Sequence, residues 1–520
     1  MKKSVFILFA LSLTLFGQAQ MRMAVIADPH VLSTSLFDDG SAFNDAKNGS
    51  SRVIEYSQQL FDSAVSIITD EQPELVLLVG DLTNDGEKLS HQHIVAKLTQ
   101  LKNSGIQPIV IPGNNDIANK NAYLYQGDKK VQTESVSQAE FESMYSDFGL
   151  SQAVSREKDS LSYMVYPTDK LAVICLNSAK KNTPATQYNE GGLYESTIAW
   201  AESAAAKAKS EGRMVIAMMH HQITDHFNME NEMTPSYVAN TTDGYPALEN
   251  LQSRLLAAGV EVVLTGHYHM TSIKHTMNEG KQLYDVSTGS LSSYPSPIRW
   301  LTLSNNGQLA ITTQTIDTYH ELELKRNENT AMGLISRAAN TAYPMIDKVK
   351  NDAKIKMMLT LAGLSFDDFN LPSSKAQMQS DMASKMLPSM TTMINELSRG
   401  DENTRQPAEN LKACMDGVDA YVKDVVCGGN EELADVLQVL IAEYRTMLYS
   451  MCHSVFYNYV GEDATQVVPD NANTLTINVP ANTALDAVSN NPLSTKILNN
   501  GTIYILRNGH VYDVLGKQLD

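Results

Sequence analysis

Residues 21 to about 317 predict an α/β fold, in which the strands of a sheet alternate with helices. Short apolar runs recur along this segment, each bounded by glycine, proline or polar residues, and stretches with apolar residues at helical spacing lie between them. The strand pattern then stops and returns only near the end of the chain. We therefore expect a mostly α-helical region and a small C-terminal β-hairpin module after the α/β part.

The predicted strands are apolar throughout, which is typical of strands covered on both faces. In chain order they are MAVIA (23–27), ELVLLV (74–79), PIVIP (108–112), LAVICL (171–176), MVIAMM (214–219) and VEVVLT (260–265). Helices are expected between them. Residues 52–71 carry apolar side chains at helical spacing, and residues 91–105 end in a glycine suited to a helix C-cap.

The sequence divides into four segments: residues 1–19, an α/β domain at 20–323, a helical accessory domain at 324–466 and a small β module at 467–520. The helical segment is rich in Ala, Met, Leu, Lys and Glu. Its methionines at 378–397 recur at helical spacing, so we expect them to fill a core. Residues 500–520 contain a strand, an Asn-Gly turn and a second strand.

The N-terminus has the pattern of a secretory signal peptide. Lys2 and Lys3 precede an apolar run from Val5 to Phe16, and small residues follow up to Ala19. This run is shorter than the roughly 20 residues that cross a bilayer, so we expect cleavage and no membrane span in the mature chain. The chain is therefore expected to be exported, to the periplasm or to the cell exterior.

The C-terminal module offers a second indication of export. In its NG, YI and VYDVLG elements it resembles the tails of secreted proteins from bacteria that use a type IX sorting route. A structural hairpin that caps the helical region explains the same residues equally well.

Five polar motifs follow five of the predicted strands, each at the carboxyl end. They are Asp28-Pro29-His30, Gly80-Asp81, Gly113-Asn114-Asn115-Asp116, His220-His221 and Gly266-His267-Tyr268-His269. Ligands bind at the carboxyl ends of strands in open α/β sheets, so these motifs are expected to converge. Their carboxylate, amide and imidazole groups suit a pair of divalent metal ions. Each motif alone is common, but five in this order are not expected by chance.

The overall composition narrows the substrate class. Lys plus Arg number 40 and Asp plus Glu number 59, which gives a formal net charge of -19. A surface this negative disfavours binding to a nucleic-acid backbone, so we expect no nucleic-acid polymer as partner. A small phosphorylated substrate stays compatible, because bound divalent cations reverse the local potential.

The order D-x-H, GD, GN-x-D, H and G-H-x-H resembles that of the calcineurin-like metallophosphoesterases over residues 21–317. Segments such as GDLTNDGE, IPGNNDIANKNA and TGHYHM are similar to a branch of bacterial phosphodiesterases. The resemblance implies a two-layered β-sandwich flanked by helices, with two metal ions (Mn, Fe, Zn or similar) at one end. It also implies that a hydroxide bridging the two ions attacks the phosphorus of an ester.

The resemblance also assigns ligands. Asp28, His30 and His269 are expected to bind one ion, Asn114, His220 and His267 the other, and Asp81 is expected to bridge both. His220 is chosen as the ligand of the tandem histidines, which leaves His221 to contact substrate or solvent.

The sequence departs from the family pattern at Asn115, where the family commonly has a histidine that protonates the leaving group. The Asn side chain cannot act as an acid, so we expect a preference for leaving groups of low pKa unless His221 or His226 protonates the leaving group instead. Asn115 is then expected to donate a hydrogen bond to substrate. Asp116 is expected to orient this loop.

Two residues downstream of the last motif are candidate substrate contacts. Tyr294 and Arg299 lie in a proline-punctuated segment that is expected to wall the pocket, with Arg299 binding phosphate. Packing of Arg299 on Trp300 is an equally good interpretation.

Three functions fit these residues. The preferred one is a phosphodiesterase acting on a small substrate. The same ligands also suit a phosphomonoesterase, including a protein Ser/Thr phosphatase. A non-catalytic metal-binding surface protein is the third, and the complete ligand set argues against it.

Overall fold

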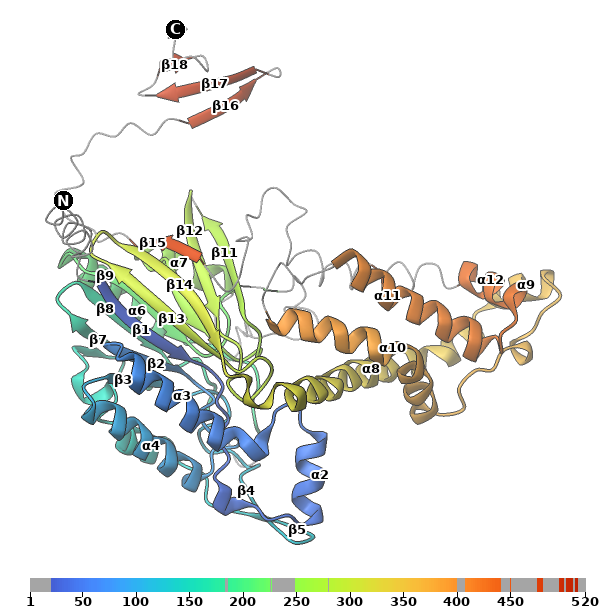
Figure 1. Ribbon diagram of the computed structural model, residues 1–520. Coiled ribbons are helices and arrows are strands. Elements are labelled where there is room, and N and C mark those ends of the chain that lie inside the picture. Colours follow the sequence, from blue (N-terminus) through green and yellow to red (C-terminus); the bar gives the residue numbers. More distant parts are fainter. Residues whose placement is uncertain are drawn as a thin grey trace, which may run out of the picture.

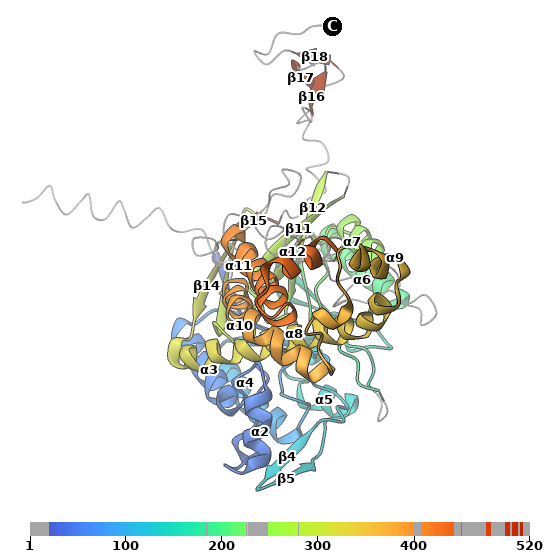
Figure 2. The ribbon, with the colours of Figure 1, turned by 90° about the vertical axis from the view of Figure 1, so that its right-hand side faces the viewer.

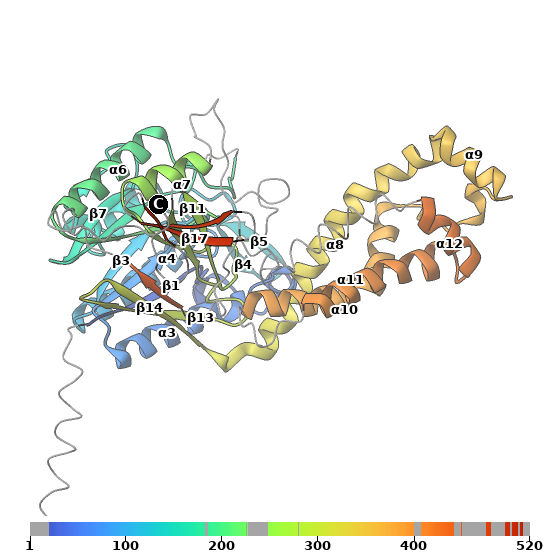
Figure 3. The same cartoon turned by 90° about the horizontal axis from the view of Figure 1, so that it is seen from above.

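The structure is a computed structural model that describes residues 20–182, 186–224, 226, 248–278, 280–399, 407–440, 449, 475–479, 495–499, 502–507 and 510–512. The expected signal peptide at 1–19 lies outside these ranges. Two sheets form the body of the molecule (Figure 1). Figure 3 shows α6 (Glu195–Ser210) and α7 (Leu248–Ala257) on one side of the strands and α3 (Ser57–Glu71) on the other. The predicted α/β sandwich flanked by helices is therefore confirmed.

The first sheet has the strand order β15-β14-β13-β1-β2-β3. Its strands are β1 (Gln20–Ile26), β2 (Leu75–Val79), β3 (Gln107–Ile111), β13 (Pro297–Ser304), β14 (Gln308–Thr315) and β15 (Leu475–Asn478). β1, β2 and β3 are parallel, because α3 and α4 (Lys88–Asn103) return the chain between them. β13 pairs with β1 in the antiparallel direction.

The second sheet has the strand order β11-β12-β10-β9-β8-β7-β6. Its strands are β6 (Ser155–Arg156), β7 (Tyr163–Thr168), β8 (Leu171–Leu176), β9 (Met214–Met219), β10 (Val262–Thr265), β11 (Ser272–Asn278) and β12 (Lys281–Ser287). β8, β9, β10 and β12 are parallel neighbours. Smaller elements of the body are α2 (Ser41–Gly49), β4 (Tyr123–Gln126), β5 (Lys129–Gln132) and α5 (Gln138–Met144).

The alternation of side chains along β8 explains the layering. Val173 and Cys175 belong to the same buried cluster as the strands of the first sheet, whereas Ala172 and Ile174 pack with α6 and α7. Successive residues of a strand point to opposite faces, so β8 is buried on both sides. This burial is why the strand reads as a continuous apolar run.

The last segment of the chain contributes to two sheets. β15 falls in the range 467–520 assigned to the C-terminal module, yet it pairs with β14 in the first sheet. β16 (Thr495–Asn499), β17 (Thr502–Arg507) and β18 (His510–Tyr512) form a separate three-stranded sheet, which includes the predicted hairpin.

The helical region projects from the body as an arm, which points toward the viewer in Figure 2. Its helices are α8 (His320–Asn351), α9 (Ala353–Leu361), α10 (Lys375–Arg399), α11 (Pro407–Ala420), a π-helical turn at Tyr421–Val426 and α12 (Glu431–Leu440). Met386, Met390 and Met393 of α10 pack with Ile335 of α8 in a buried cluster, as expected of methionines that fill a core. No helix in the described ranges is both long and apolar enough to span a membrane.

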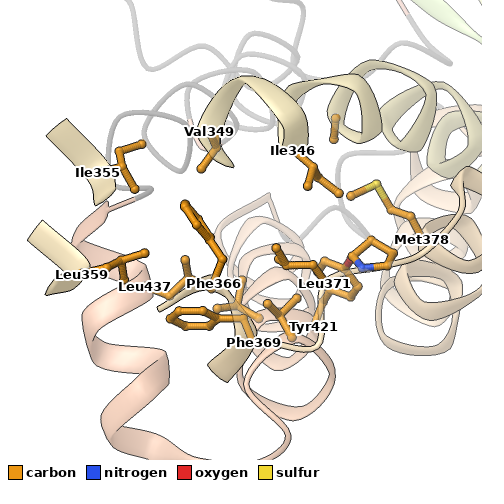
Figure 4. A pocket seen from close by; sticks show the side chains of 14 residues that line it. Ile346, Val349, Ile355, Leu359, Phe366, Phe369, Leu371, Met378, Tyr421 and Leu437 are labelled. Atoms are coloured by element: carbon orange, nitrogen blue, oxygen red, sulfur yellow. The ribbon is translucent and has the colours of Figure 1, made fainter. Parts of the chain in front are cut away.

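Farther along the arm, the helices line an apolar cavity of about 270 Å³ that is partly open (Figure 4). Its walls come from α8, α9 and α12 and from the segment around Phe366 and Phe369. The hydroxyl of Tyr421, on the π-helical turn, is buried there and forms no hydrogen bond with the described residues.

The root of the arm is fixed to the body through one side of α8. Tyr319 stacks on Tyr56 at a centroid distance of 4.2 Å, just before the helix begins. One turn later Glu323 accepts a hydrogen bond from Ser296, and Arg326 forms a 2.6 Å ion pair with Glu55. Contacts at this spacing line one face of a helix, so this face of α8 is held against Glu55, Tyr56 and Ser296.

We predict that Arg326→Met lowers the free energy of unfolding by about 3 kcal/mol, because it leaves the carboxylate of Glu55 with no charge partner in a largely buried site. The Arg326 and Glu55 side chains are only 7% and 11% exposed. Urea unfolding measures the change. The double variant Glu55→Gln/Arg326→Met serves as the control and should lose less than the sum of the single changes; additive losses would contradict the pairing.

Candidate metal centre

The five sequence motifs meet at one end of the sandwich. Asp28, Asp81 and Asn114 directly follow β1, β2 and β3, which are parallel neighbours in the first sheet. His220 and His267 follow β9 and β10, which are parallel neighbours in the second. Parallel strands present their carboxyl ends at the same edge, and here the edges of both sheets come together.

The predicted ligands form overlapping groups with the spacing of a metal site. Within each group, one nitrogen or oxygen from every residue lies within 4.8 Å of the others. The groups are Asp28, His30 and His269; Asp28, Asp81 and His220; and His220, His221 and His267. The amide oxygen of Asn114 adjoins them, 3.1 Å from Nε2 of His220.

Some ligand atoms of these groups are electron-pair donors that lack suitable hydrogen-bond partners among the described residues, and a cation would bind them. Oδ1 of Asp28 is fully buried and accepts no hydrogen bond from the described residues. Nε2 of His30 faces Nε2 of His269 at 2.9 Å, although both atoms are the lone-pair donors that metals use. A buried carboxylate oxygen without a partner is costly, and a divalent cation accepts both kinds of donor. The residues present therefore fit metal ions.

The pKa shifts of the histidines also indicate a site for metal ions. Burial lowers the pKa of His30, as does the guanidinium of Arg52, and burial also lowers the pKa of His267. These two imidazoles are thus kept neutral, the form that binds metal. Burial opposes charge on His220, but the carboxylates of Asp81 and Asp28 outweigh it and raise its pKa. A proton on His220 offsets the two carboxylates, a role that a cation takes over.

The backbone is strained at the ligands themselves. Asp28, His30, Asp81, His267 and His269 have φ angles of 48°, 44°, 47°, 67° and 59°. Residues other than glycine rarely adopt this left-handed region, and each instance costs on the order of 1–3 kcal/mol. Strain at five of the seven predicted ligands indicates a site that the surrounding fold holds in place.

Two glycines permit the close packing of these loops. A Cβ atom on Gly113 would lie 2.2 Å from both the backbone nitrogen and Oδ1 of Asp81. A Cβ atom on Gly266 would lie 2.4 Å from Oδ2 of Asp28. Larger residues at these positions would displace the carboxylates.

Buried hydrogen bonds orient the ligands. Nδ1 of His220 donates to the carbonyl of Val79 at 2.9 Å, which turns Nε2 toward the carboxylates. Oδ2 of Asp28 accepts the backbone N–H of His267 at 2.8 Å. The carbonyl of Asn114 accepts hydrogen bonds from the side chains of Asn182 and Gln187.

Asp116 fastens the β2 and β3 loops together. Its carboxylate accepts the backbone N–H groups of Leu82, Thr83 and Gly113 at 2.8–3.1 Å and the hydroxyl of Thr83 at 2.9 Å. The residue is fully buried and lies outside the pocket lining. These hydrogen bonds link Asp116 to both loops and are compatible with the expected positioning role.

Asn115 lies in the pocket and clamps Asp81. Its backbone N–H donates to Oδ1 and its side-chain amide donates to Oδ2 of Asp81, both at 2.8 Å. Asn115 is therefore placed both to hold a predicted ligand and to meet a substrate.

His221 requires a correction. It was expected to contact substrate or solvent, but it is fully buried, and its ring nitrogens are bonded to the hydroxyl of Ser178 at 2.8 Å and the carbonyl of Asn189 at 2.9 Å. His226 is also buried, with Nδ1 2.9 Å from the hydroxyl of Ser272 and Nε2 3.2 Å from the carboxylate of Asp285. Neither histidine lines the pocket, so neither replaces the missing acid at position 115.

The two downstream substrate contacts were wrong. Arg299 is fully buried in β13 and donates to the carbonyl of Ser287 at 2.7 Å and the hydroxyl of Thr313 at 3.3 Å. Tyr294 is 5% exposed and its ring packs on His320 at the root of α8. Arg299 lies within β13, whose side chains pack in the sheet, and Tyr294 lies before this strand. Neither residue lines the pocket.

The pocket also contains residues that the sequence did not point to. Its volume is about 740 Å³, and it is open to solvent at the metal centre. The additional lining residues are Gly49, Ser50, Ser51, Arg52, Asp85, Asn121, Asn189, Glu190, Tyr268 and Arg337. Apart from Tyr268, inside the last motif, none of them belongs to a strand-end motif. Asp85 and Asn121 lie in the segments GDLTNDGE and IPGNNDIANKNA, and the others carry no local signal.

A two-sheet sandwich with carboxylate, amide and imidazole ligands gathered at one end defines the class of metal-dependent hydrolases. The family is that of the calcineurin-like phosphoesterases: residues 21–271 match its family model and belong to it. This range contains all seven predicted ligands. The protein is accordingly a phosphoester hydrolase with a site for divalent metal ions.

Solved structures with a similar fold include a dimetal phosphatase from Danio rerio, with 13% identity and a TM-score of 0.40 over 57% of this chain and 96% of that one. PhoD is similar at 12% identity and a TM-score of 0.34, over 57% and 66% of the two chains. A protein from Thermus thermophilus is 11% identical, with a TM-score of 0.29 over 57% and 99% of the two chains. At these TM-scores the likeness adds nothing to the family match. A comparison with curated proteins finds no match.

We predict that Asp116→Asn lowers the free energy of unfolding by about 2 kcal/mol, because the new amide group meets N–H donors and leaves them unsatisfied. Metal affinity should fall by about 10–100-fold, since the loops of Asp81 and Asn114 lose their common anchor. Urea unfolding and metal titration measure these effects. Asp147→Asn, on an exposed carboxylate, is the control; unchanged metal affinity in Asp116→Asn would refute the positioning role.

Proposed function

We propose that the protein is a phosphodiesterase that uses two divalent metal ions to hydrolyse a small phosphorylated substrate. The observation that carries this proposal is the overlap of the ligand groups. The group of Asp28, His30 and His269 and the group of His220, His221 and His267 are linked by a third group, Asp28, Asp81 and His220, which shares one residue with each. Oδ2 of Asp81 is 3.7 Å from Nε2 of His30 and 3.4 Å from Nε2 of His220, which supports a bridging role.

The proposed ligands divide accordingly. Asp28, His30 and His269 hold one ion, Asn114, His220 and His267 hold the other, and Asp81 serves both. Divalent ions bound there supply Lewis acidity toward the phosphoryl group and lower the pKa of bound water. The chain's own residues keep the carboxylates buried and the imidazoles oriented, so little reorganisation is needed when charge develops on the phosphoryl oxygens.

The pocket favours a small substrate with a leaving group of low pKa. A volume of about 740 Å³ is in the range of small-molecule sites. Asn115 offers an amide donor and no acid, and the buried His221 and His226 have their ring nitrogens engaged elsewhere. A poor alkoxide leaving group therefore lacks a proton donor among these residues.

A phosphomonoesterase is the second candidate, and one observation favours it. Two arginines, Arg52 and Arg337, line the pocket, and guanidinium groups match the geometry and charge of a phosphoryl dianion. Relative rates on p-nitrophenyl phosphate and bis-p-nitrophenyl phosphate separate the two candidates. Export is also part of the proposal, supported by Lys2, Lys3 and the apolar run that follows them.

We predict that Asp81→Asn lowers metal-dependent turnover of bis-p-nitrophenyl phosphate by at least about 100-fold, because the residue is proposed to serve both ions. Metal content, measured in parallel, should fall, and chelation of the wild type should reproduce the loss. Asp147→Asn, on an exposed carboxylate, is the matched control. Retention of metal-dependent turnover in Asp81→Asn would sink the proposed function.

We predict that Asn115→His raises turnover of an alkyl phosphodiester by about 10-fold or more, since a positioned general acid typically contributes roughly 10²–10⁴-fold. Bis-p-nitrophenyl phosphate, whose leaving group needs no proton, should gain nothing. Asn115→Ala controls for loss of the amide contact with Asp81. No gain on the alkyl ester, with metal content intact, would count against the role of position 115.

A further inference from the structure

Two guanidinium groups from distant parts of the chain line the pocket beside the metal centre. Arg52 comes from the loop between α2 and α3, and Arg337 comes from α8 of the helical region. Neither belongs to the ligand set.

Arg52 lies at the inner rim of the pocket. It is half-buried, its backbone N–H donates to the hydroxyl of Ser50 at 3.0 Å, and its Nη1 contacts Nδ1 of His30. Within the described ranges it forms no ion pair with a carboxylate. Burial raises the pKa of Asp85 in the same pocket and the charge of Arg52 opposes that shift, so the two groups are electrostatic neighbours without an ion pair. A half-buried guanidinium beside a metal centre is suited to an anionic ligand.

The loop that carries Arg52 is held by the helical region. The side-chain amide of Asn329, on α8, donates to the carbonyls of Asn48 at 2.8 Å and Ser50 at 2.6 Å. Arg326 pairs with Glu55 on the other side of Arg52 and also donates to the carbonyl of Lys47. α8 thus fixes both ends of the loop segment.

Arg337 lies on the same face of α8 as Arg326. Eleven residues separate them, which is three helical turns plus about 20°, so the face that grips the body also presents Arg337 toward it. Arg337 lines the pocket. The helix therefore anchors one arginine and contributes the other.

Two acidic residues of the same pocket have donors of their own. Asp85 accepts from the side chains of Asn84 at 2.7 Å and Asn119 at 3.3 Å, and Glu190 lies 3.5 Å from Nζ of Lys180. Each of these carboxylates therefore has a partner other than Arg52 in the described chain.

We propose that Arg52 and Arg337 form an anion-binding subsite next to the metal centre, built jointly by the α/β body and the helical region. The subsite takes negative charge on the substrate beyond the single charge of a simple phosphodiester. That charge resides either on the reacting group, as in a phosphomonoester dianion, or on a second phosphate nearby. The inference rests on the proposed phosphoester hydrolysis and specifies the substrate class of that site.

The test compares Arg52→Met and Arg337→Met with Lys325→Met, which removes an exposed charge from the same helix outside the pocket. Three chromogenic probes are used with metal-loaded enzyme: bis-p-nitrophenyl phosphate, p-nitrophenyl phosphate, and a thymidine 5′-p-nitrophenyl phosphate that carries a 3′-phosphate. Inorganic phosphate binding, measured by titration calorimetry, gives a readout independent of turnover.

Both arginine variants should lose about 10–100-fold in kcat/KM on a probe that carries more than one negative charge and weaken phosphate binding by a similar factor, as expected for a charged hydrogen bond. Arg337→Met should leave turnover of bis-p-nitrophenyl phosphate unchanged, and Lys325→Met should change neither readout. Because Arg52 also contacts His30, the loss in Arg52→Met on each probe is compared with its loss on bis-p-nitrophenyl phosphate. A loss confined to p-nitrophenyl phosphate places the extra charge on the reacting group, and a loss confined to the 3′-phosphorylated probe places it on a second phosphate.

Equal losses on all three probes, or unchanged phosphate binding, would overturn the subsite. If the wild type hydrolyses none of the three esters, the proposed function fails for these substrates. In that event the phosphate titrations still decide whether the two arginines bind an anion.

Discussion

The structure depends on the burial of two carboxylates, Asp28 and Asp81, among imidazoles at the meeting point of two sheets. Buried negative charge is tolerated only with a compensating positive charge, and here His220 is the group whose pKa rises in response. The left-handed backbone at Asp28 and Asp81, the glycines that let the loops approach and the four hydrogen bonds to Asp116 all keep these carboxylates in place. The rest of the fold thus offsets the unfavourable free energy of a site that is suited to cations.

The helical region, which forms the arm, also contributes to this site. Tyr319, Glu323, Arg326 and Asn329 attach α8 to the body. Of these, Arg326 and Asn329 hold the loop that carries Arg52. Three turns beyond Arg326, Arg337 reaches the same pocket. The apolar cavity that the arm lines lies elsewhere, with walls that start at Ala342. The part of the arm near the body therefore contributes a charged side chain to the pocket, whereas the part farther out lines an apolar cavity.

Two features determine the chemistry of the pocket: position 115 has no acidic group, and the pocket walls contain two guanidinium groups. An amide in place of an acid shifts the balance toward good leaving groups, because the nearby His221 and His226 are committed to buried hydrogen bonds. The two guanidinium groups add positive charge, which favours substrates that carry more of the opposite sign. The ligand set defines the reaction class, and the walls of the pocket narrow the substrate.

The sequence by itself determined six strands, three in each sheet, because each is a buried apolar run whose period is local, and it placed a polar motif after five of them. It also determined the departure at Asn115. Only the tertiary structure decided whether a side chain is buried or lines the pocket, when its neighbours come from distant segments of the chain. Arg299 reads as a pocket cation but lies inside β13, and His221 reads as a substrate contact but is bonded to Ser178 and Asn189. Arg52 and Arg337 carry no local signal, because 285 positions separate them and only the docking of α8 brings both to the pocket.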